Sequence, residues 1–187
     1  MPITINGTGT VAGISVGGVN DGAIAHADLA DSTKPIFTSY ALLEDQKSSG
    51  TTGGTNTEDT WATRDLNTEV ADPDGIVSIS SNDFTLQAGS YLIKWTSSFY
   101  RVGEIKTRLL DVTNSAARGA GSSAYTNTSG NDQVESRGAA RVTPSGATAY
   151  RIQYYNSDVK SSNGLGVEAS SGEVEVYTRV EIYKEAS

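Results

Sequence analysis

Cysteine is absent from this chain of 187 residues, and histidine occurs once, at His26. Without cysteine the chain has no disulfide bonds, no zinc–thiolate centre and no thiol catalysis. A single imidazole makes transition-metal sites and hydrolase triads unexpected, because imidazole is the commonest metal ligand and catalytic base. We therefore predict no catalytic site, no metal and no cofactor.

Positive charge is scarce, because 14 Lys and Arg stand against 22 Asp and Glu, for a formal net charge of -8. Nucleic-acid binding needs clustered cations, and an anionic membrane surface repels an acidic chain, so we expect neither as a partner. No apolar run reaches the ~18 residues that a membrane-spanning helix needs. The first residues show no basic and apolar leader, which favours the cytoplasm of a bacterium, or a virus assembled there.

The residues that are abundant favour β-structure. Glycine, serine and threonine make up about a third of the chain, and valine, isoleucine and tyrosine outnumber strong helix formers, which is typical of an all-β protein.

The first 36 residues alternate apolar side chains with threonine, asparagine and glycine, which predicts short extended segments with bends. A brief helix is expected over 23–30. A segment this small buries no core alone, so we expect it to anchor the protein to its own copies or to a larger partner; a flexible tail is the alternative. The apolar positions of this anchor segment are Ile3, Ile5, Val11, Ile14, Val16, Ile24 and Leu29.

Residues 37–187 are predicted to form one domain of short antiparallel strands. Asp72-Pro73-Asp74-Gly75 and Pro144-Ser145-Gly146 are strong turn signals. About eight to ten strands joined by connections of uneven length favour a jelly-roll sandwich over an up-and-down barrel. The expected strands are 37–45, 61–70, 76–80, 84–86, 90–101, 104–112, 133–142, 148–156 and 173–184.

Alternation with a period of two assigns one face of the long strands to a core. In the last strand Val174 shares the apolar face, whereas Glu175 and Arg179 lie on the other. The predicted core positions are Phe84, Tyr91, Ile93, Trp95, Phe99, Val176, Val180 and Ile182.

Three segments resemble the C1q/TNF-like superfamily of jelly rolls. Leu66-Asn67-Thr68-Glu69, followed by Phe84–Ile93 with its Phe-Thr pair and Gly-x-Tyr motif, is similar to the front half of that fold. Tyr177–Lys184 is similar to its closing strand. The resemblance implies a homotrimer in which one face of each sandwich is turned towards the threefold axis.

Tyrosine suits such an interface, because it combines a large apolar ring with a hydroxyl group. The chain has nine tyrosines and only three phenylalanines. Alternation places Tyr100, Tyr177 and Tyr183 opposite the core, where we expect them at the trimer interface. Tyrosines half-buried at sheet edges are the alternative.

The N-terminal Gly7–Gly22 segment resembles segments near the heads of tail-fibre and appendage proteins of tailed bacteriophages. This resemblance implies a virion protein that contacts other virion proteins through its N-terminus. Polar loops over about 47–58, 113–132 and 156–172 are rich in Ser, Thr, Asn and Gly, and they are candidates for binding a host-surface glycan.

Four sequence patterns resemble functional sites but are better explained as ordinary structural features. Asp72–Gly75 lacks the spacing of an EF-hand and reads as a turn. Asp28 and Asp31 beside His26 read as a solvated helix end. Glu104 and Asp111, a candidate glycosidase pair, are separated by an odd number of residues and so are expected on opposite strand faces. The glycine-rich 47–57 segment has no following Gly-Lys-Ser, so no P-loop is expected.

Three functions therefore stay open. The first is a non-enzymatic, homotrimeric phage fibre or appendage, attached through 1–36, whose jelly roll binds the host surface. The second is a capsid decoration protein that stabilises the head. The third, from another class, is a glycan-active enzyme or cellular lectin.

Overall fold

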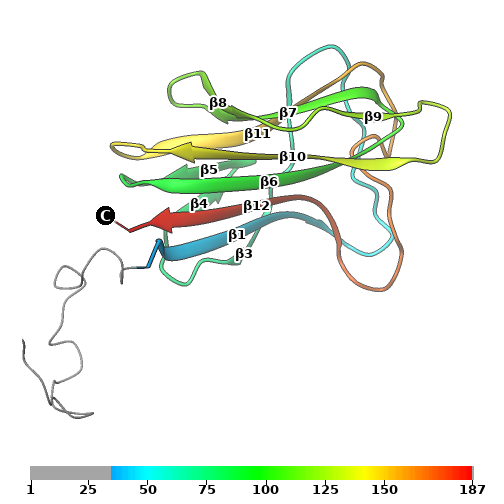
Figure 1. The fold of residues 1–187 in the computed structure, drawn as a ribbon. Coiled ribbons are helices and arrows are strands. Elements are labelled where there is room, and N and C mark those ends of the chain that lie inside the picture. Colours follow the sequence, from blue (N-terminus) through cyan, green and yellow to red (C-terminus); the bar gives the residue numbers. More distant parts are fainter. Residues whose placement is uncertain (1–34, 187) are drawn as a thin grey trace, which may run out of the picture. The chain divides into compact units, whose positions relative to one another are not determined.

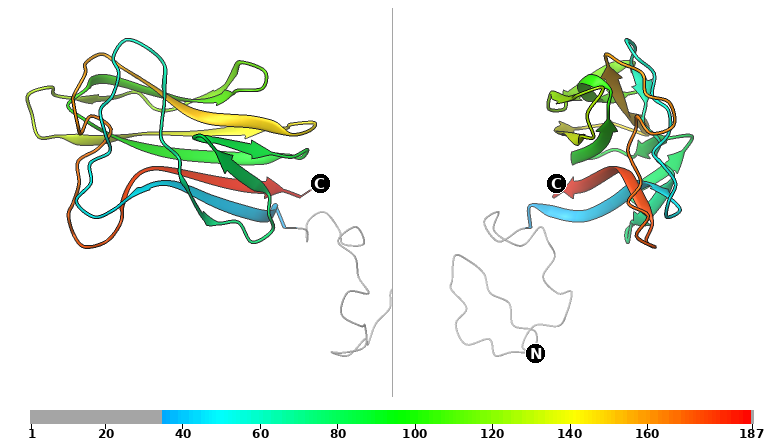
Figure 2. Two further views of the ribbon diagram at one scale, coloured as in Figure 1. Left: turned by 180° about the vertical axis from the view of Figure 1, so that it is seen from behind. Right: turned by 90° about the vertical axis from the view of Figure 1, so that its right-hand side faces the viewer.

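The computed structural model describes residues 35–186. These residues form two antiparallel β-sheets packed face to face, and no helix is present among them (Figures 1 and 2). The prediction of an all-β jelly-roll sandwich is thereby confirmed. None of the described residues forms a helix long and apolar enough to cross a membrane.

Neighbouring strands of each sheet come from distant parts of the sequence. The first and last strands, β1 and β12, pair along nearly their whole length beside the long strand β6. The five-stranded sheet contains, in spatial order, β10 (Gln133–Val142), β6 (Tyr91–Tyr100), β12 (Glu175–Glu185), β1 (Phe37–Lys47) and β3 (Thr68–Ala71). The seven-stranded sheet contains β4 (Val77–Ser80), β5 (Asp83–Leu86), β11 (Thr148–Asn156), β7 (Gly103–Asp111) and β8 (Ala116–Ala120), with β2 (Ala62–Thr63) paired to β11 and β9 (Ala124–Thr126) paired to β7.

The core fills the space between the two sheets, because each long strand turns alternate side chains inwards. Trp95 is the largest of these side chains, and its indole Nε1–H donates a hydrogen bond to Thr107 Oγ1 at 2.9 Å. Of the predicted core positions, the buried ones are Phe84, Tyr91, Ile93, Trp95, Phe99, Val180 and Ile182.

Two expected segments differ from the structure. The strand expected over 61–70 is divided into β2 and β3, which belong to different sheets, so the chain crosses the sandwich at residues 64–67. The loop expected over 113–132 contains β8 and β9, which pair one after the other along the edge of β7 that faces away from β11. Their alanine- and glycine-rich sequence carries little strand propensity, so pairing with β7 decides their structure.

A β-bulge changes the phase of the last strand. Asp45 pairs with Thr178, but Gln46 pairs with Val176, so Tyr177 is an extra residue in β12. One extra residue exchanges the two faces of a strand on either side of it. The predicted core position Val176 is therefore only half-buried, whereas Tyr177 is buried. Val174, placed on the same apolar face, lies before the strand and is exposed.

Candidate functional site

The outward face of the five-stranded sheet is the first candidate site. Its side chains form rows across the strands, because the registers of β10, β6, β12 and β1 are continuous there. The rows are Arg137–Thr96–Arg179–Glu44, Ala139–Lys94–Glu181–Leu42 and Arg141–Leu92–Tyr183–Tyr40.

A hollow of about 600 Å³ lies on this face. The short side chains of Thr96 and Ser98 on β6 lie between longer charged side chains on the neighbouring strands β10 and β12. Ion pairs link neighbouring strands on this face. Lys94 Nζ on β6 lies 3.1 Å from Glu181 Oε2 on β12, and Arg179 Nε on β12 lies 2.7 Å from Glu44 Oε1 on β1.

An aromatic patch continues this face towards the start of β1. Tyr40, Leu42 and Tyr183 line a second hollow of about 400 Å³, which shares Arg179 with the first. The rings of Phe37 and Tyr183 lie 5.3 Å apart, and Tyr40 is 50% exposed. The face therefore combines exposed aromatic area with paired charges.

The three tyrosines predicted for a trimer interface are not equivalent. Tyr183 lies on this outward face, and its hydroxyl donates to Glu181 Oε2. Tyr100 is half-buried near the far end of β6 and donates to Asn131 Oδ1. Tyr177 contradicts the prediction: it is only 3% exposed, and its hydroxyl donates to the carbonyl oxygen of Thr51 at 2.7 Å. The bulge in β12 turns it into the domain.

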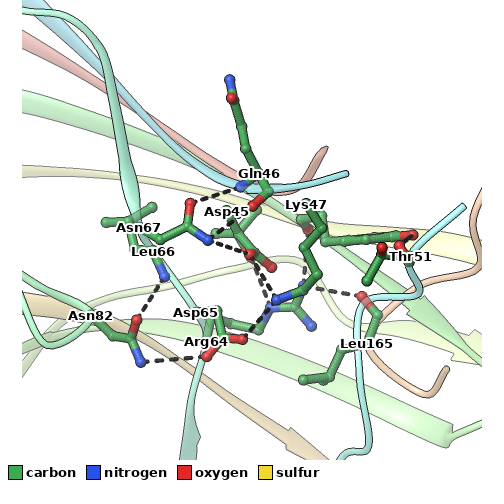
Figure 3. Close-up of polar contacts among 12 residues, drawn as sticks. Asp45, Gln46, Lys47, Thr51, Arg64, Asp65, Leu66, Asn67, Asn82 and Leu165 are labelled. Carbon is green, nitrogen blue, oxygen red and sulfur yellow. Dashed lines mark hydrogen bonds and ion pairs between the residues drawn. The ribbon is translucent and has the colours of Figure 1, made fainter. Parts of the chain in front are cut away.

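A buried cluster of charged side chains lies where the chain crosses between the sheets (Figure 3). Arg64, which directly follows β2, is 1% exposed. Its Nε donates to Thr178 Oγ1 at 2.8 Å, and one terminal nitrogen donates to the carbonyl oxygens of Leu165 and Tyr177. The guanidinium also lies over the Phe99 ring, 5.1 Å from its centroid. Arg64 thus joins a loop, the bulge and the core.

The other members of this cluster balance the charge of Arg64. Lys47 Nζ lies 3.2 Å from Asp45 Oδ1 and 3.1 Å from Asp65 Oδ2. Burial raises the pKa of Asp45 above its ordinary 3.8, although Lys47 and Arg64 oppose this rise. Burial lowers the pKa of the Arg64 guanidinium to about 10, so it stays charged at neutral pH. Two cations and two carboxylates therefore share this site.

This buried charged cluster was not predicted from the sequence. Arg64 lies within a stretch that alternates like an ordinary strand, and a charged residue there is ordinarily expected at the surface. The signal in the sequence that could have indicated its burial is that Arg64 is a charged residue at a position that alternation assigns to the core. Through Arg64 the cluster holds the loop before β12 at the carbonyl of Leu165, and we assign the cluster a structural role.

Glu175, the first residue of β12, binds two of the polar loops through their backbone. Its carboxylate accepts hydrogen bonds from the N–H groups of Gly50, Ala169 and Ser170, at 3.1, 3.0 and 2.8 Å. These backbone donors hold the pKa of Glu175 below its ordinary 4.5. The ionised carboxylate therefore stabilises the loop arrangement.

Acidification is expected to loosen these loops. A depressed carboxyl pKa contributes stability that is present above pH 4.5 and is lost as the pH falls through the folded-state pKa. Amide hydrogen exchange at Gly50, Ala169 and Ser170 should accelerate on acidification relative to Glu175→Gln, which lacks this titration. Glu173→Gln, a neighbouring exposed position, is the control and should behave as the wild type. Equal pH profiles for the wild type and Glu175→Gln would contradict this role.

The acidic patterns singled out in the sequence do not converge on a reactive site. Glu104 is exposed and lies on the opposite strand face from Asp111, which is buried and bound by Arg118 and Asn114. Asp72 caps its own turn, because its carboxylate accepts from the N–H groups at 76 and 77. Among residues 35–186 no cluster of three or more metal-ligating His, Cys, Asp or Glu side chains is found. Residues 1–34, which contain all the predicted anchor positions, the helix expected over 23–30 and His26, lie outside the described residues.

Comparison with known proteins supports the fold and leaves the family open. No protein-family model matches the sequence, and no curated protein matches it. Among solved structures, murine APRIL at pH 5.0 aligns with a TM-score of 0.53 and 9% identity over 78% of this chain and 98% of its own. Eiger TNF from S. frugiperda aligns with a TM-score of 0.53 and 14% identity over 81% and 94%. The described domain has the C1q/TNF-like jelly-roll fold. A globular domain of zebrafish complement 1qA protein aligns at 0.48, with 12% identity over 78% and 95%.

Proposed function

We propose that this chain is a non-enzymatic, homotrimeric structural protein of a bacteriophage virion, a fibre or appendage. Its N-terminal segment, residues 1–36, attaches it to other virion proteins, and its jelly roll presents a surface to the host cell. The C1q/TNF-like fold supports the trimeric part, and the resemblance of Gly7–Gly22 to phage appendage segments supports the virion part.

The outward face of the five-stranded sheet is the observation that carries the proposal. It places Phe37, Tyr40 and Tyr183 beside a hollow of about 600 Å³, with paired charges around it. Exposed aromatic side chains next to complementary charges are typical of surfaces that bind another protein chain. A second copy of the chain also offers aromatic side chains and paired charges. Three copies arranged around one axis can therefore bury this face of the five-stranded sheet.

The molar mass in solution tests this arrangement. Light scattering should give about three times 19.6 kDa for the wild type. Thr96→Arg places a third guanidinium between Arg137 and Arg179 in the hollow, so it should yield monomers with an unchanged circular dichroism spectrum. Thr85→Arg, the same change on the outward face of β5, is the matched control and should stay trimeric. A chain lacking residues 1–36 should also stay trimeric and should no longer join the virion.

A monomeric wild type would overturn the trimer, and unchanged virion assembly without residues 1–36 would overturn the attachment role. A glycan array separates the host-binding appendage from the alternative of a capsid decoration protein, because a decoration protein is expected to bind no glycan. Turnover of a polysaccharide would instead support a glycan-active enzyme.

A further inference from the structure

The outward face of the seven-stranded sheet carries a separate hollow, on the opposite side of the sandwich from the two hollows of the five-stranded sheet. It measures about 430 Å³, and its lining includes Trp61, Lys106 and Arg108. The ring of Tyr155 lies 5.9 Å from that of Trp61. Aromatic and cationic side chains from the segment before β2, from β7 and from β11 thus meet at one place on the surface.

Trp61 holds Arg108 in a defined orientation. The guanidinium carbon of Arg108 lies 4.0 Å from the centroid of the Trp61 ring, and its Nε donates to Gln153 Oε1 at 2.9 Å. Neither terminal nitrogen of Arg108 makes a hydrogen bond to another residue of the described 35–186 segment. A guanidinium fixed in this way presents two preorganised donors, the geometry that binds a carboxylate through both oxygens.

Small side chains leave room beside this guanidinium. Ala120 pairs with Arg108 across the β7–β8 ladder, and Ala117 and Gly119 line the same hollow. Larger residues at these positions of β8 would fill the space next to Arg108. The hollow is therefore unfilled on the side of Arg108 that faces β8.

Both cations and carboxylates lie near this hollow: Glu104 shares the outward face of β7 with Lys106, and Asp59 accepts a hydrogen bond from the Tyr155 hydroxyl at 2.8 Å. In the part of the chain that the structure describes, neither Lys106 nor Arg108 forms an ion pair with a carboxylate, and Lys106 Nζ contacts only the hydroxyl of Ser123, at 3.1 Å. The third cation, Arg118, is paired with Asp111. Two cations without an ion-pair partner in the described segment, one of them stacked on a tryptophan, favour an anionic ligand here.

We propose that this hollow binds an acidic saccharide, a sugar ring that carries a carboxylate. The carboxylate accepts hydrogen bonds from Arg108 and Lys106, the ring lies over the small residues of β8, and Trp61 contacts its apolar C–H groups. This inference rests on the proposed host-surface role and specifies its ligand class and its site. A nucleic acid is disfavoured because two cations on an acidic chain neutralise few phosphates.

Titration of the full-length protein with tetragalacturonate tests the site, with maltotetraose as the neutral sugar and tetraglutamate as the acidic non-sugar. Isothermal titration calorimetry measures all affinities, because Trp61→Ala removes the fluorescent reporter. In the wild type a fluorescence change on binding reports Trp61, since Trp95, the other of the two tryptophans, is buried. Trp61→Ala and Arg108→Gln should each weaken tetragalacturonate binding about tenfold, the size expected for one stacked or bidentate contact. Lys160→Ala, which removes a cation from the loop between β11 and β12, is the matched control and should bind within about twofold of the wild type.

Absence of tetragalacturonate binding, equal binding of tetraglutamate, or equal affinities for Trp61→Ala and Lys160→Ala would each overturn the inference. Molar mass is measured on the same samples. A trimer that binds host cells or neutral glycans but not tetragalacturonate overturns this site and leaves the proposed function standing. A monomer that binds tetragalacturonate through Trp61 overturns the trimer and keeps the site.

Discussion

Arg64→Ala is expected to lower the free energy of unfolding by about 3–5 kcal/mol, the usual cost of removing one partner from a buried charged network. The substitution leaves the carbonyl oxygens of Leu165 and Tyr177 without their donor. It also removes one of the two cations that oppose the desolvation of Asp45, and it opens a cavity beside Phe99. Urea unfolding at one fixed protein concentration measures the change, because the stability of a trimer, as proposed here, would depend on concentration.

The control is a cation outside both sheets. Lys160 lies in the loop between β11 and β12, so Lys160→Ala should leave the unfolding midpoint nearly unchanged. Replacing both charges, as in Arg64→Met with Asp45→Asn, should recover at least half of the loss, because no uncompensated buried charge remains. Equal unfolding midpoints for Arg64→Ala and Lys160→Ala would show that the cluster does not stabilise the fold.

Gly138→Ala is expected to cost about 1–3 kcal/mol through overpacking. Gly138 pairs with Trp95 across β10 and β6, and a Cβ atom at this position would overlap the indole ring. The ring cannot move aside freely, because its Nε1–H is bonded to Thr107, whose hydroxyl lies 2.8 Å from that of Ser136. The loss should appear as a lower unfolding midpoint together with a changed near-ultraviolet circular dichroism signal from Trp95.

Gly146→Ala is the matched control. A Cβ atom at Gly146 would meet no atom within 4 Å. This substitution should therefore change the stability by less than about 0.5 kcal/mol. If both alanine variants unfold at the same urea concentration, the packing of Trp95 against Gly138 does not limit stability.

These effects bear on function through the loops and the two outward faces. Arg64 and Glu175 hold the loops around residues 50, 165 and 170 against β12. Trp95 and its hydrogen bonds join β6 of one sheet to β7 of the other. The hollow over Thr96 and the hollow beside Arg108 thus lie on opposite sides of one core, which places the proposed assembly face and the proposed ligand face on different sheets.

Sequence reasoning predicted the class of fold because alternation is a local property. Strands 133–142 and 148–156 agree with β10 and β11 residue for residue, since a turn with proline and glycine separates two clearly alternating segments. The positions of Glu104 and Asp111 on opposite faces follow from the same rule. The resemblance carried by Phe84–Ile93 added the type of jelly roll, which composition alone does not distinguish from other sandwiches.

The remaining features depend on contacts between distant segments. Tyr177 was placed on the wrong face because the bulge opposite Asp45 and Gln46 arises from pairing with β1, some 130 residues earlier in the chain, and leaves no local signal. Arg64 supplies the donor for the carbonyl of that extra residue. Trp61 and Arg108 meet only because β2 and β7 both pair with β11.

The amino-acid sequence by itself determined that this protein is a β-sandwich with an acidic surface and no thiol chemistry, because composition and period-two alternation act within a few neighbouring residues. Only the tertiary structure decided which arginine is buried, which tyrosine faces inwards and which side chains share an outer face. Those outcomes depend on strand register and sheet order, which are set by pairing across the whole domain.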